Sequence, residues 1–399
     1  MGKGRSNDNN NSLKLIKFIK LITFITLITL IIIWILSSKV PINTTCLWGK
    51  NVNEKFYPRK EKDPISALET AFTTHLGRPL DPIHSSLFGA PNKFVDSAPT
   101  LNEEWKAKFK QFLDWKEKGK KEKKTKKIVV TGLIRNAEAK ALLWKSWVTE
   151  FVKEWADYRV VISENNSLDR TRSHLLEWSA KDEKVVIMCD DEVIVNQNEC
   201  NLSGIFSLEY VGRYLAPDVE RIQKMSILRN LYRDYICKFF SDFDYVLVID
   251  FDLNGELFID GLEHSLGMMT NDKTIHGVAC NGMLWNPERN DFLYYDSFAH
   301  IDKGESYLFP SVQSKQQHDE YIQTTITQRY RNSVKPRQVE SAFGGACLYR
   351  MKPFCEGKYS FSTDFLSCEH GHFHHNMNIT VNPHMVFVIM GNNGYDNHS

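Results

Sequence analysis

Residues 245–252 read Tyr245-Val246-Leu247-Val248-Ile249-Asp250-Phe251-Asp252, an apolar run that leads directly into two acids. Such a continuous apolar run predicts a strand buried on both faces, as in parallel sheets. In an extended segment, side chains two positions apart point the same way, so Asp250 and Asp252 can face one divalent cation. Mn²⁺ and Mg²⁺ prefer hard oxygen ligands and also bind diphosphate oxygens. We therefore expect a metal site here; the alternative is that both acids are ordinary loop residues.

Strands and helices alternate on the N-terminal side of this run. The apolar pattern predicts strands at Ile128–Leu133, Arg159–Ser163 and Lys184–Met188, and helices at Ala137–Trp155, Arg170–Ala180 and Asp218–Phe240. This alternation is typical of an α/β fold with a parallel sheet, in which ligands bind beyond the carboxyl ends of the strands. The residues at those ends are Arg135–Asn136, Glu164–Asn166, Cys189–Asp191 and Asp250–Asp252. The acids among them predict a metal together with a hydroxyl-rich ligand.

Three further stretches carry candidate binding residues. Arg221 and Arg229 lie eight positions apart on one predicted helix, where they could bind a diphosphate or simply form a surface pair. Glu164 could accept hydrogen bonds from a ribose or a base. Gly344 and Gly345 precede an apolar strand and permit close backbone approach to a ligand, although a bulge or turn needs no ligand.

The stretch Cys368–Asn376, CEHGHFHHN, is rich in histidine. If it is extended, His370, His372 and His374 share one face of the strand. One interpretation makes a histidine here the third ligand of the metal held by the aspartates. The alternatives are a separate zinc site with Cys355 or Cys368, and a purely structural cluster.

The N-terminal region predicts a membrane anchor. Residues 21–36, LITFITLITLIIIWIL, carry no charge, and Lys14, Lys17 and Lys20 precede them. The positive-inside rule then places the N-terminus in the cytosol and the body in the lumen, although a cleaved signal peptide is the alternative. Some of the eight cysteines could pair in an oxidising lumen. We expect this organisation: tail 1–20, anchor 21–38, stem and linker 39–127, and catalytic domain 128–399, divided into a nucleotide-binding half 128–252 and an acceptor half 253–399.

Composition excludes several classes of protein. Of 399 residues, 42% are hydrophobic and 25% charged, which is ordinary for a globular chain and argues against a mainly disordered or many-span membrane protein. Fifty basic and 49 acidic residues leave a net charge of +1. A near-neutral chain has no global basic field, so we expect no nucleic-acid partner.

The order of these motifs over about residues 128–385 resembles glycosyltransferases of the GT-A type, which use nucleotide sugars. The matching features are Arg135–Asn136, the Glu-Asn-Asn-Ser turn at 164–167, the Arg/Arg–Asn helix, Asp250-Phe251-Asp252, Tyr294–Phe298, Phe-Gly-Gly and Cys-Glu-His. The later part is similar to capsule-associated mannosyltransferases and procollagen galactosyltransferases. The resemblance implies a Rossmann-like, mixed but mostly parallel sheet flanked by helices.

The resemblance also implies roles for individual residues. Asp252 would bind Mn²⁺ or Mg²⁺ directly, Asp250 would contact ribose or a metal-bound water, and His372 or His374 would be the third ligand. The implied donor contacts are Arg221 and Arg229 near the diphosphate and Glu164 near the base or ribose. In an inverting reaction, Asp296 or Glu369 would deprotonate the acceptor hydroxyl.

The resemblance implies the substrates and the compartment as well. The donor would be a UDP- or GDP-sugar and the acceptor a glycan or glycoprotein. Transferases of this kind are usually single-pass type II proteins of the Golgi or ER membrane. Two other functions stay open: a non-catalytic carbohydrate-binding protein on a degenerate transferase fold, and a zinc-dependent hydrolase.

Overall fold

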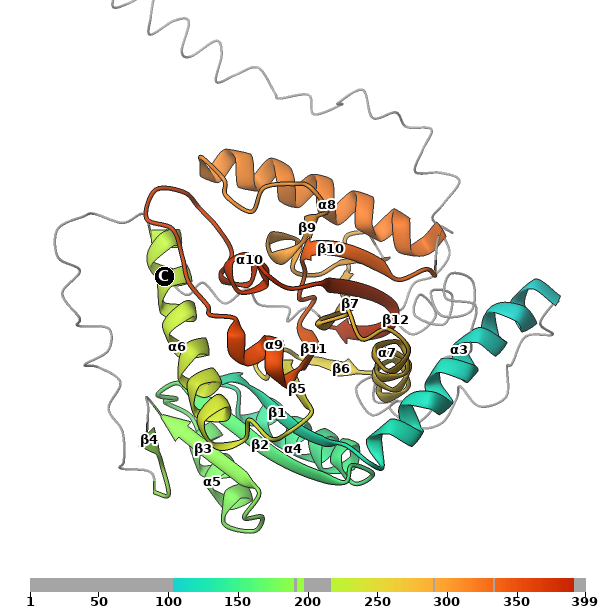
Figure 1. Ribbon diagram of the computed structural model, residues 1–399. Helices are drawn as coiled ribbons and strands as arrows, with labels where there is room; N and C mark the ends of the chain where they lie inside the picture. Colours follow the sequence, from blue (N-terminus) through green and yellow to red (C-terminus); the bar gives the residue numbers. More distant parts are fainter. Residues whose placement is uncertain (1–102, 190–191, 197–216, 290, 333, 391–399) are drawn as a thin grey trace, which may run out of the picture. The chain divides into compact units, whose positions relative to one another are not determined.

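The computed structural model describes residues 103–390, apart from 190–191, 197–216, 290 and 333 (Figure 1). The predicted cytosolic tail, the membrane anchor at 21–38 and most of the predicted stem lie outside the described residues. None of the helices in the described part is both long enough and apolar enough to span a membrane.

One mixed sheet of twelve strands forms the centre of the described chain (Figure 1). Its parallel part runs in the order β3 (Val185–Cys189), β2 (Asp157–Glu164), β1 (Lys127–Ile134) and β5 (Tyr245–Ile249). The order continues through β11 (Ala346–Arg350), β7 (Gly277–Asn286), β12 (Ile379–Ile389), β10 (Arg337–Ser341) and β9 (Ile301–Asp302). In this second part only β7 and β12 pair in parallel. Three short strands complete the sheet: β4 (Glu192–Val193), β6 (Gly255–Leu257) and β8 (Asp291–Tyr294).

Helices cover both faces of the sheet, and each face has its own apolar core. The first core packs under α4 (Glu138–Val152), α5 (Thr171–Ser179) and α7 (Ile259–Asn271). The second packs under α6 (Pro217–Phe239), α8 (Val312–Asn332), α9 (Met351–Glu356) and α10 (Glu369–His374). Neighbouring residues of β5 alternate between the two cores: Leu247 belongs to the first and Val248 to the second. All four predicted strands and all three predicted helices are confirmed. Burial on both faces of the sheet explains the continuous apolar runs of the strands.

The chain path gives the sheet a topological switch point between two inner strands. From β1 the chain moves outward to β2 and β3, and α6 then returns it to β5 on the other side of β1. The point between the carboxyl ends of β1 and β5 is therefore the topological switch point, where open α/β sheets bind their ligands. Asp250 follows β5 directly at this point.

Helix α3 (Glu103–Lys123) belongs to the compact body, although it falls within the predicted stem and linker. It crosses α7 so closely that a Cβ on Gly119 would lie 1.8 Å from the carbonyl oxygen of Glu263. Lys123 belongs to a lysine-rich run at residues 116–127, KEKGKKEKKTKK. It is nevertheless buried, and its Nζ lies 2.7 Å from the carboxylate of Glu263. The predicted boundary near Lys127 therefore does not separate α3 from the body.

A C-terminal segment is tied to α6 along several turns. Cys237 and Cys355 form a disulfide, which confirms the expectation of paired cysteines. Asn230 donates to the carbonyl of Tyr359 at 2.8 Å and accepts from its amide at 3.0 Å. Ser226 donates its hydroxyl to the carbonyl of Ser360 at 3.0 Å. These contacts fix α6 against the loop that leads into α10.

Candidate functional site

Asp250 and Asp252 lie at the carboxyl end of β5. The amide of Asp250 donates to the carbonyl of Gly345 at 3.0 Å, and Phe251 between the two acids is fully buried. Asp252 is exposed, and its carbonyl accepts a hydrogen bond from Lys140. Burial raises the pKa of Asp250 and the nearby charge of Asp252 raises it further, to about 6, although Arg229 opposes both. The charge of Asp252 therefore acts directly on the carboxylate of Asp250.

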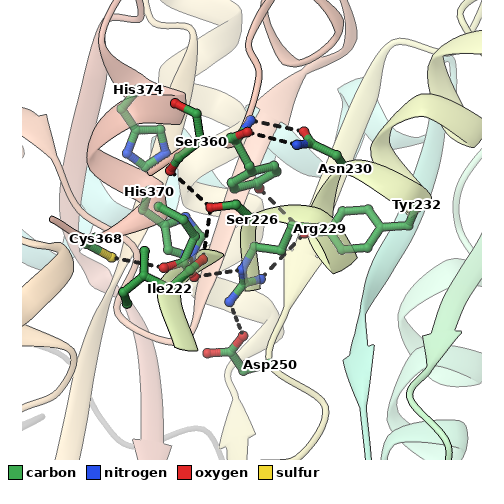
Figure 2. A network of polar contacts seen from close by, with 12 residues as sticks. Ile222, Ser226, Arg229, Asn230, Tyr232, Asp250, Ser360, Cys368, His370 and His374 are labelled. Atoms are coloured by element: carbon green, nitrogen blue, oxygen red, sulfur yellow. Dashed lines mark hydrogen bonds and ion pairs between the residues drawn. The ribbon is translucent and has the colours of Figure 1, made fainter. Parts of the chain in front are cut away.

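Arg229 of α6 contacts the carboxylate of Asp250, which lies directly below it in Figure 2. Its Nη2 lies 3.1 Å from Asp250 Oδ1, and its Nε lies 3.0 Å from Glu369 Oε1. Its Nη1 donates to the hydroxyl of Tyr232 at 3.4 Å, and the guanidinium carbon lies 5.3 Å from the ring centroid of Phe343. The side chain is only 4% exposed. Arg229 was predicted near a diphosphate, but the structure gives each of its nitrogens a partner inside the protein.

Glu369, at the start of α10, is a buried partner of this arginine. Its side chain is 7% exposed, and its second carboxylate oxygen lies 3.6 Å from the thiol of Cys368. A buried carboxylate bonded to a guanidinium is poorly placed to meet an acceptor hydroxyl. The structure thus gives Glu369 a positioning role, in contrast to its predicted role as a base.

Of the two predicted bases, Asp296 is the one whose carboxylate is not bound to another side chain of the described residues. It lies between β8 and the short helix η4 (Ser297–Ala299), with a left-handed backbone at φ 62°. Within the described residues its carboxylate has no hydrogen-bond partner, and the residue is half-buried. Burial raises its pKa, and the charges of Asp250 and Glu369 raise it further, to about 7. We call Asp250, Asp252, Asp296 and Glu369 the acid cluster, because their charges act on one another.

The histidine-rich stretch is a helix and not the extended segment that its spacing suggested. In α10, His370 and His374 lie one turn apart on one face, while His372 points elsewhere. His374 is buried, with Ser341 Oγ 2.9 Å from Nδ1 and Tyr349 Oη 2.7 Å from Nε2. It therefore has no free nitrogen for a metal, and burial lowers its pKa to about 3.

Of the two histidines predicted as metal ligands, His372 keeps a ring nitrogen without a hydrogen bond within the described residues. It is half-buried, and its Nε2 lies 2.9 Å from the hydroxyl of Ser367. In the described part of the chain its Nδ1 has no hydrogen-bond partner. Of the two predicted histidine ligands, only His372 could contribute a nitrogen.

The predicted alternative of a separate zinc site loses its sulfur ligands. Cys355 is in the disulfide, and the Cys368 thiol lies against Glu369, where burial raises its pKa. Among the described residues, no three His, Cys, Asp or Glu side chains come together to hold a metal by themselves.

The aspartate pair does fit a metal that is shared with a substrate. Within the described chain, Asp250 Oδ2 and the whole Asp252 carboxylate have no hydrogen-bond partner. Mg²⁺-type ions are commonly held by one or two carboxylates together with substrate phosphates, and not by a complete protein cage. Asp250 and Asp252 supply this donor set at the switch point.

Glu164 lies at the end of β2, but its carboxylate is fully buried. Its Oε2 lies 2.6 Å from Arg172 Nε, and its Oε1 accepts from the amide of Ser167 at 2.5 Å. Both oxygens are therefore used to fix the loop that follows β2. This differs from the prediction that Glu164 contacts a ribose or base.

Gly344 and Gly345 approach the protein backbone and not a ligand. Both are buried with positive φ, 64° and 90°. A Cβ on Gly344 would lie 2.4 Å from the carbonyl oxygen of Cys280, and one on Gly345 would lie 2.8 Å from the ring of Phe387. Only glycine fits both positions, and the resulting turn aims the Gly345 carbonyl at the Asp250 amide.

Two lysines lie near the residues that follow β5 and β1. Arg221, a predicted diphosphate ligand, is exposed near the start of α6. Lys224, three residues further along the helix, is half-buried. Burial is the main reason that its pKa is lowered, and the positive charge of Arg135 adds to the effect. Lys140 reaches the carbonyl of Asp252 from α4. The sequence analysis missed Lys140 and Lys224, although the spacing of Lys224 from Arg221 places both on neighbouring positions of one helix.

No family model matches the chain, and no curated protein matches it. Among solved structures, one that aligns is the mannosyltransferase PcManGT from Pyrobaculum calidifontis in complex with GDP-Man and Mn²⁺. The identity is 12% and the TM-score 0.36, over 71% of this chain. The alignment spans 65% of the length of that structure.

Proposed function

We propose that this protein is a metal-dependent glycosyltransferase that uses a UDP- or GDP-sugar as donor. The observation that carries the proposal is the pair Asp250 and Asp252 at the topological switch point, with the free carboxylate of Asp296 in the same acid cluster. A nucleoside diphosphate needs cations around its phosphates. A sugar acceptor needs a base with a pKa near the working pH. The site offers both kinds of group.

The donor diphosphate would lie between the aspartate pair and the cations of the same edge. Arg135 and Lys224 would bind phosphate oxygens, and Lys140 would hold the Asp252 loop in place through its carbonyl. A divalent ion bound by Asp250 and Asp252 would neutralise the negative charge that develops on the leaving diphosphate. Arg229 and Glu369 would keep the Asp250 carboxylate in its orientation.

Asp296 would be the base. It would accept the proton of the acceptor hydroxyl as that oxygen attacks the sugar, which requires inversion at the anomeric carbon. The anomeric form of the product, read by NMR, therefore tests this role directly.

A thermal-shift panel of nucleoside diphosphates tests the proposed function. We expect UDP or GDP to raise the unfolding temperature in the presence of Mn²⁺ and much less with a chelator, because ligand binding stabilises the folded state by mass action. The panel also identifies the nucleotide. Binding without hydrolysis of the corresponding nucleotide sugar would favour the non-catalytic carbohydrate-binding alternative. No shift with any nucleotide would contradict the proposal.

The pH dependence of transfer follows from Asp296. An aspartate with a pKa of about 7 is mostly protonated below that pH and cannot accept a proton. We expect kcat/KM to fall about tenfold for each pH unit below 7, since kcat/KM reports the free enzyme. Asp296→Asn should abolish this limb together with most of the activity. A pH profile that is flat between 5 and 8 would exclude Asp296 as the base.

The cellular setting is also a proposal. We infer a type II protein anchored by residues 21–38, with its catalytic domain in the lumen of the Golgi or ER and a glycan or glycoprotein as acceptor. The disulfide between Cys237 and Cys355 supports it, because such bonds persist in oxidising compartments. Protease protection in sealed microsomes tests the orientation.

A further inference from the structure

We propose that the face of α8 beside η4 is the acceptor subsite, where Phe298, His318 and Asp319 bind a hydroxyl-rich saccharide next to Asp296. This inference rests on the proposed function and deepens it. It names the surface that presents the attacking hydroxyl. None of these three residues was predicted from the sequence.

The contacts place α8 against the segment that carries Asp296. Phe298 lies in η4, two residues after Asp296, and Lys315 Nζ of α8 lies 4.4 Å from its ring centroid. Lys315 Nζ also donates to Asp319 Oδ2 at 2.6 Å. One continuous set of contacts thus runs from η4 to Asp319, and the charge of Asp319 contributes to the raised pKa of Asp296.

Polar atoms on this face lack partners. Asp319 Oδ1 and both ring nitrogens of His318 are buried and have no hydrogen bond within the described residues. The nearest approach between the two residues, Nδ1 to Oδ1, is 3.7 Å, which is too long for a good hydrogen bond. A buried polar group without a partner costs about 1–3 kcal/mol. Ligand hydroxyls, which both donate and accept, would satisfy these atoms.

The surroundings have the mixed character that a sugar requires. The ring of Phe309 lies 4.8 Å from that of His318 and 6.1 Å from that of Phe298, measured between centroids. The buried Phe309 supports this arrangement, and the C–H face of a sugar would pack on the half-buried Phe298 while its hydroxyls pair with Asp319 and His318. The side chains of Lys315 and Asp319 are 24% and 23% exposed, so the face can be reached from solvent.

The subsite also has a rigid support and a charge suited to a neutral ligand. Arg329, further along α8, forms two hydrogen bonds of 3.0 Å with Asp302 of β9. This pair fixes α8 relative to the sheet. The cations Arg135, Lys140 and Lys224 come from other elements, β1's end, α4 and α6. Donor phosphates and an uncharged acceptor would therefore use different sets of side chains.

Saturation-transfer NMR with the methyl glycosides of glucose, galactose and mannose tests the subsite without donor or metal. We expect at least one glycoside to give a signal with the full chain. That signal should fall at least tenfold in Asp319→Asn and in His318→Ala. Glu320→Gln, an exposed acid next to Asp319, is the matched control and should bind like the unaltered protein. Unchanged signals in both variants, or none with the unaltered protein, would overturn the inference.

Kinetics separates this inference from the proposed function. Asp319→Asn should raise the KM of the bound glycoside as acceptor at least tenfold. The thermal shift induced by the nucleotide and Mn²⁺ should stay as large as in the unaltered protein. A loss of that shift in Asp319→Asn would place Asp319 in the donor site and overturn the assignment. Absence of nucleotide binding in the unaltered protein would instead refute the proposed function and leave the NMR result to decide the subsite.

Discussion

Replacing Asp252 by asparagine is expected to lower Mn²⁺-dependent transfer at least about 100-fold, which corresponds to ~2.7 kcal/mol of transition-state stabilisation. Asparagine keeps the size of the side chain but removes the charge that would bind the ion. Because Asp252 is exposed and its carboxylate has no hydrogen-bond partner within the described residues, the unfolding midpoint should hardly change. Steady-state rates over a Mn²⁺ titration, with denaturant unfolding of the same samples, check both points.

The matched control is Asp242→Asn. Asp242 is an exposed acid near the opposite end of β5, where its carboxylate pairs with Lys127 at 2.7 Å. Strand β5 separates it from the switch point, so this variant should retain full activity. If Asp252→Asn were as active as the unaltered protein, or if a chelator left transfer unchanged, the aspartate pair would have no role as metal ligands.

Replacing Arg229 by methionine is expected to destabilise the fold by ~3–5 kcal/mol, because it leaves two largely buried carboxylates without their cation. Asp250, whose pKa is about 6, would lose the cation that favours its charged form. The loss should therefore be smaller at pH 5, where Asp250 is mostly protonated, than at pH 8, where it is ionised. Denaturant midpoints at the two pH values measure this difference.

Arg221→Met provides the comparison on the same helix. Arg221 is exposed, so the same substitution should change stability by no more than about 0.5 kcal/mol. Equal stability of the two variants would mean that methionine packs as well as the ion pair. In that case the role of Arg229 would be confined to orienting Asp250, and only the activity would fall.

The α/β pattern could be predicted because it is local. Each buried strand, such as Tyr245–Ile249, is a short apolar run whose meaning depends on few distant residues. The histidine-rich stretch shows the opposite case. Its spacing of two suits a strand, but Phe373 stacks on Tyr359 with centroids 4.0 Å apart, and Gly371 packs on Tyr307. Tertiary contacts of this kind favour a helix, and the spacing of the histidines in the sequence does not reveal them.

The position of a residue at a strand end could be predicted from the sequence, but its contacts with distant partners could not. The placement of Asp252 at a strand end is a local fact. The pairing of Arg229 with Glu369 joins positions 140 residues apart, and a sequence without its fold gives no sign of it. Glu164 is intermediate, since its partner Arg172 lies only eight residues away in the next helix. An acid followed by an arginine at that distance deserves a structural interpretation beside the functional one.

The bond between Cys237 and Cys355 has a practical consequence for anyone producing the protein. It joins α6, which carries Arg229, to the segment that leads into Glu369. It therefore links the two elements whose ion pair supports the Asp250 carboxylate. Material made in bacterial cytoplasm would emerge with both thiols reduced and this support loosened. A eukaryotic secretory host, or refolding with a glutathione couple, would yield the species on which activity should be measured.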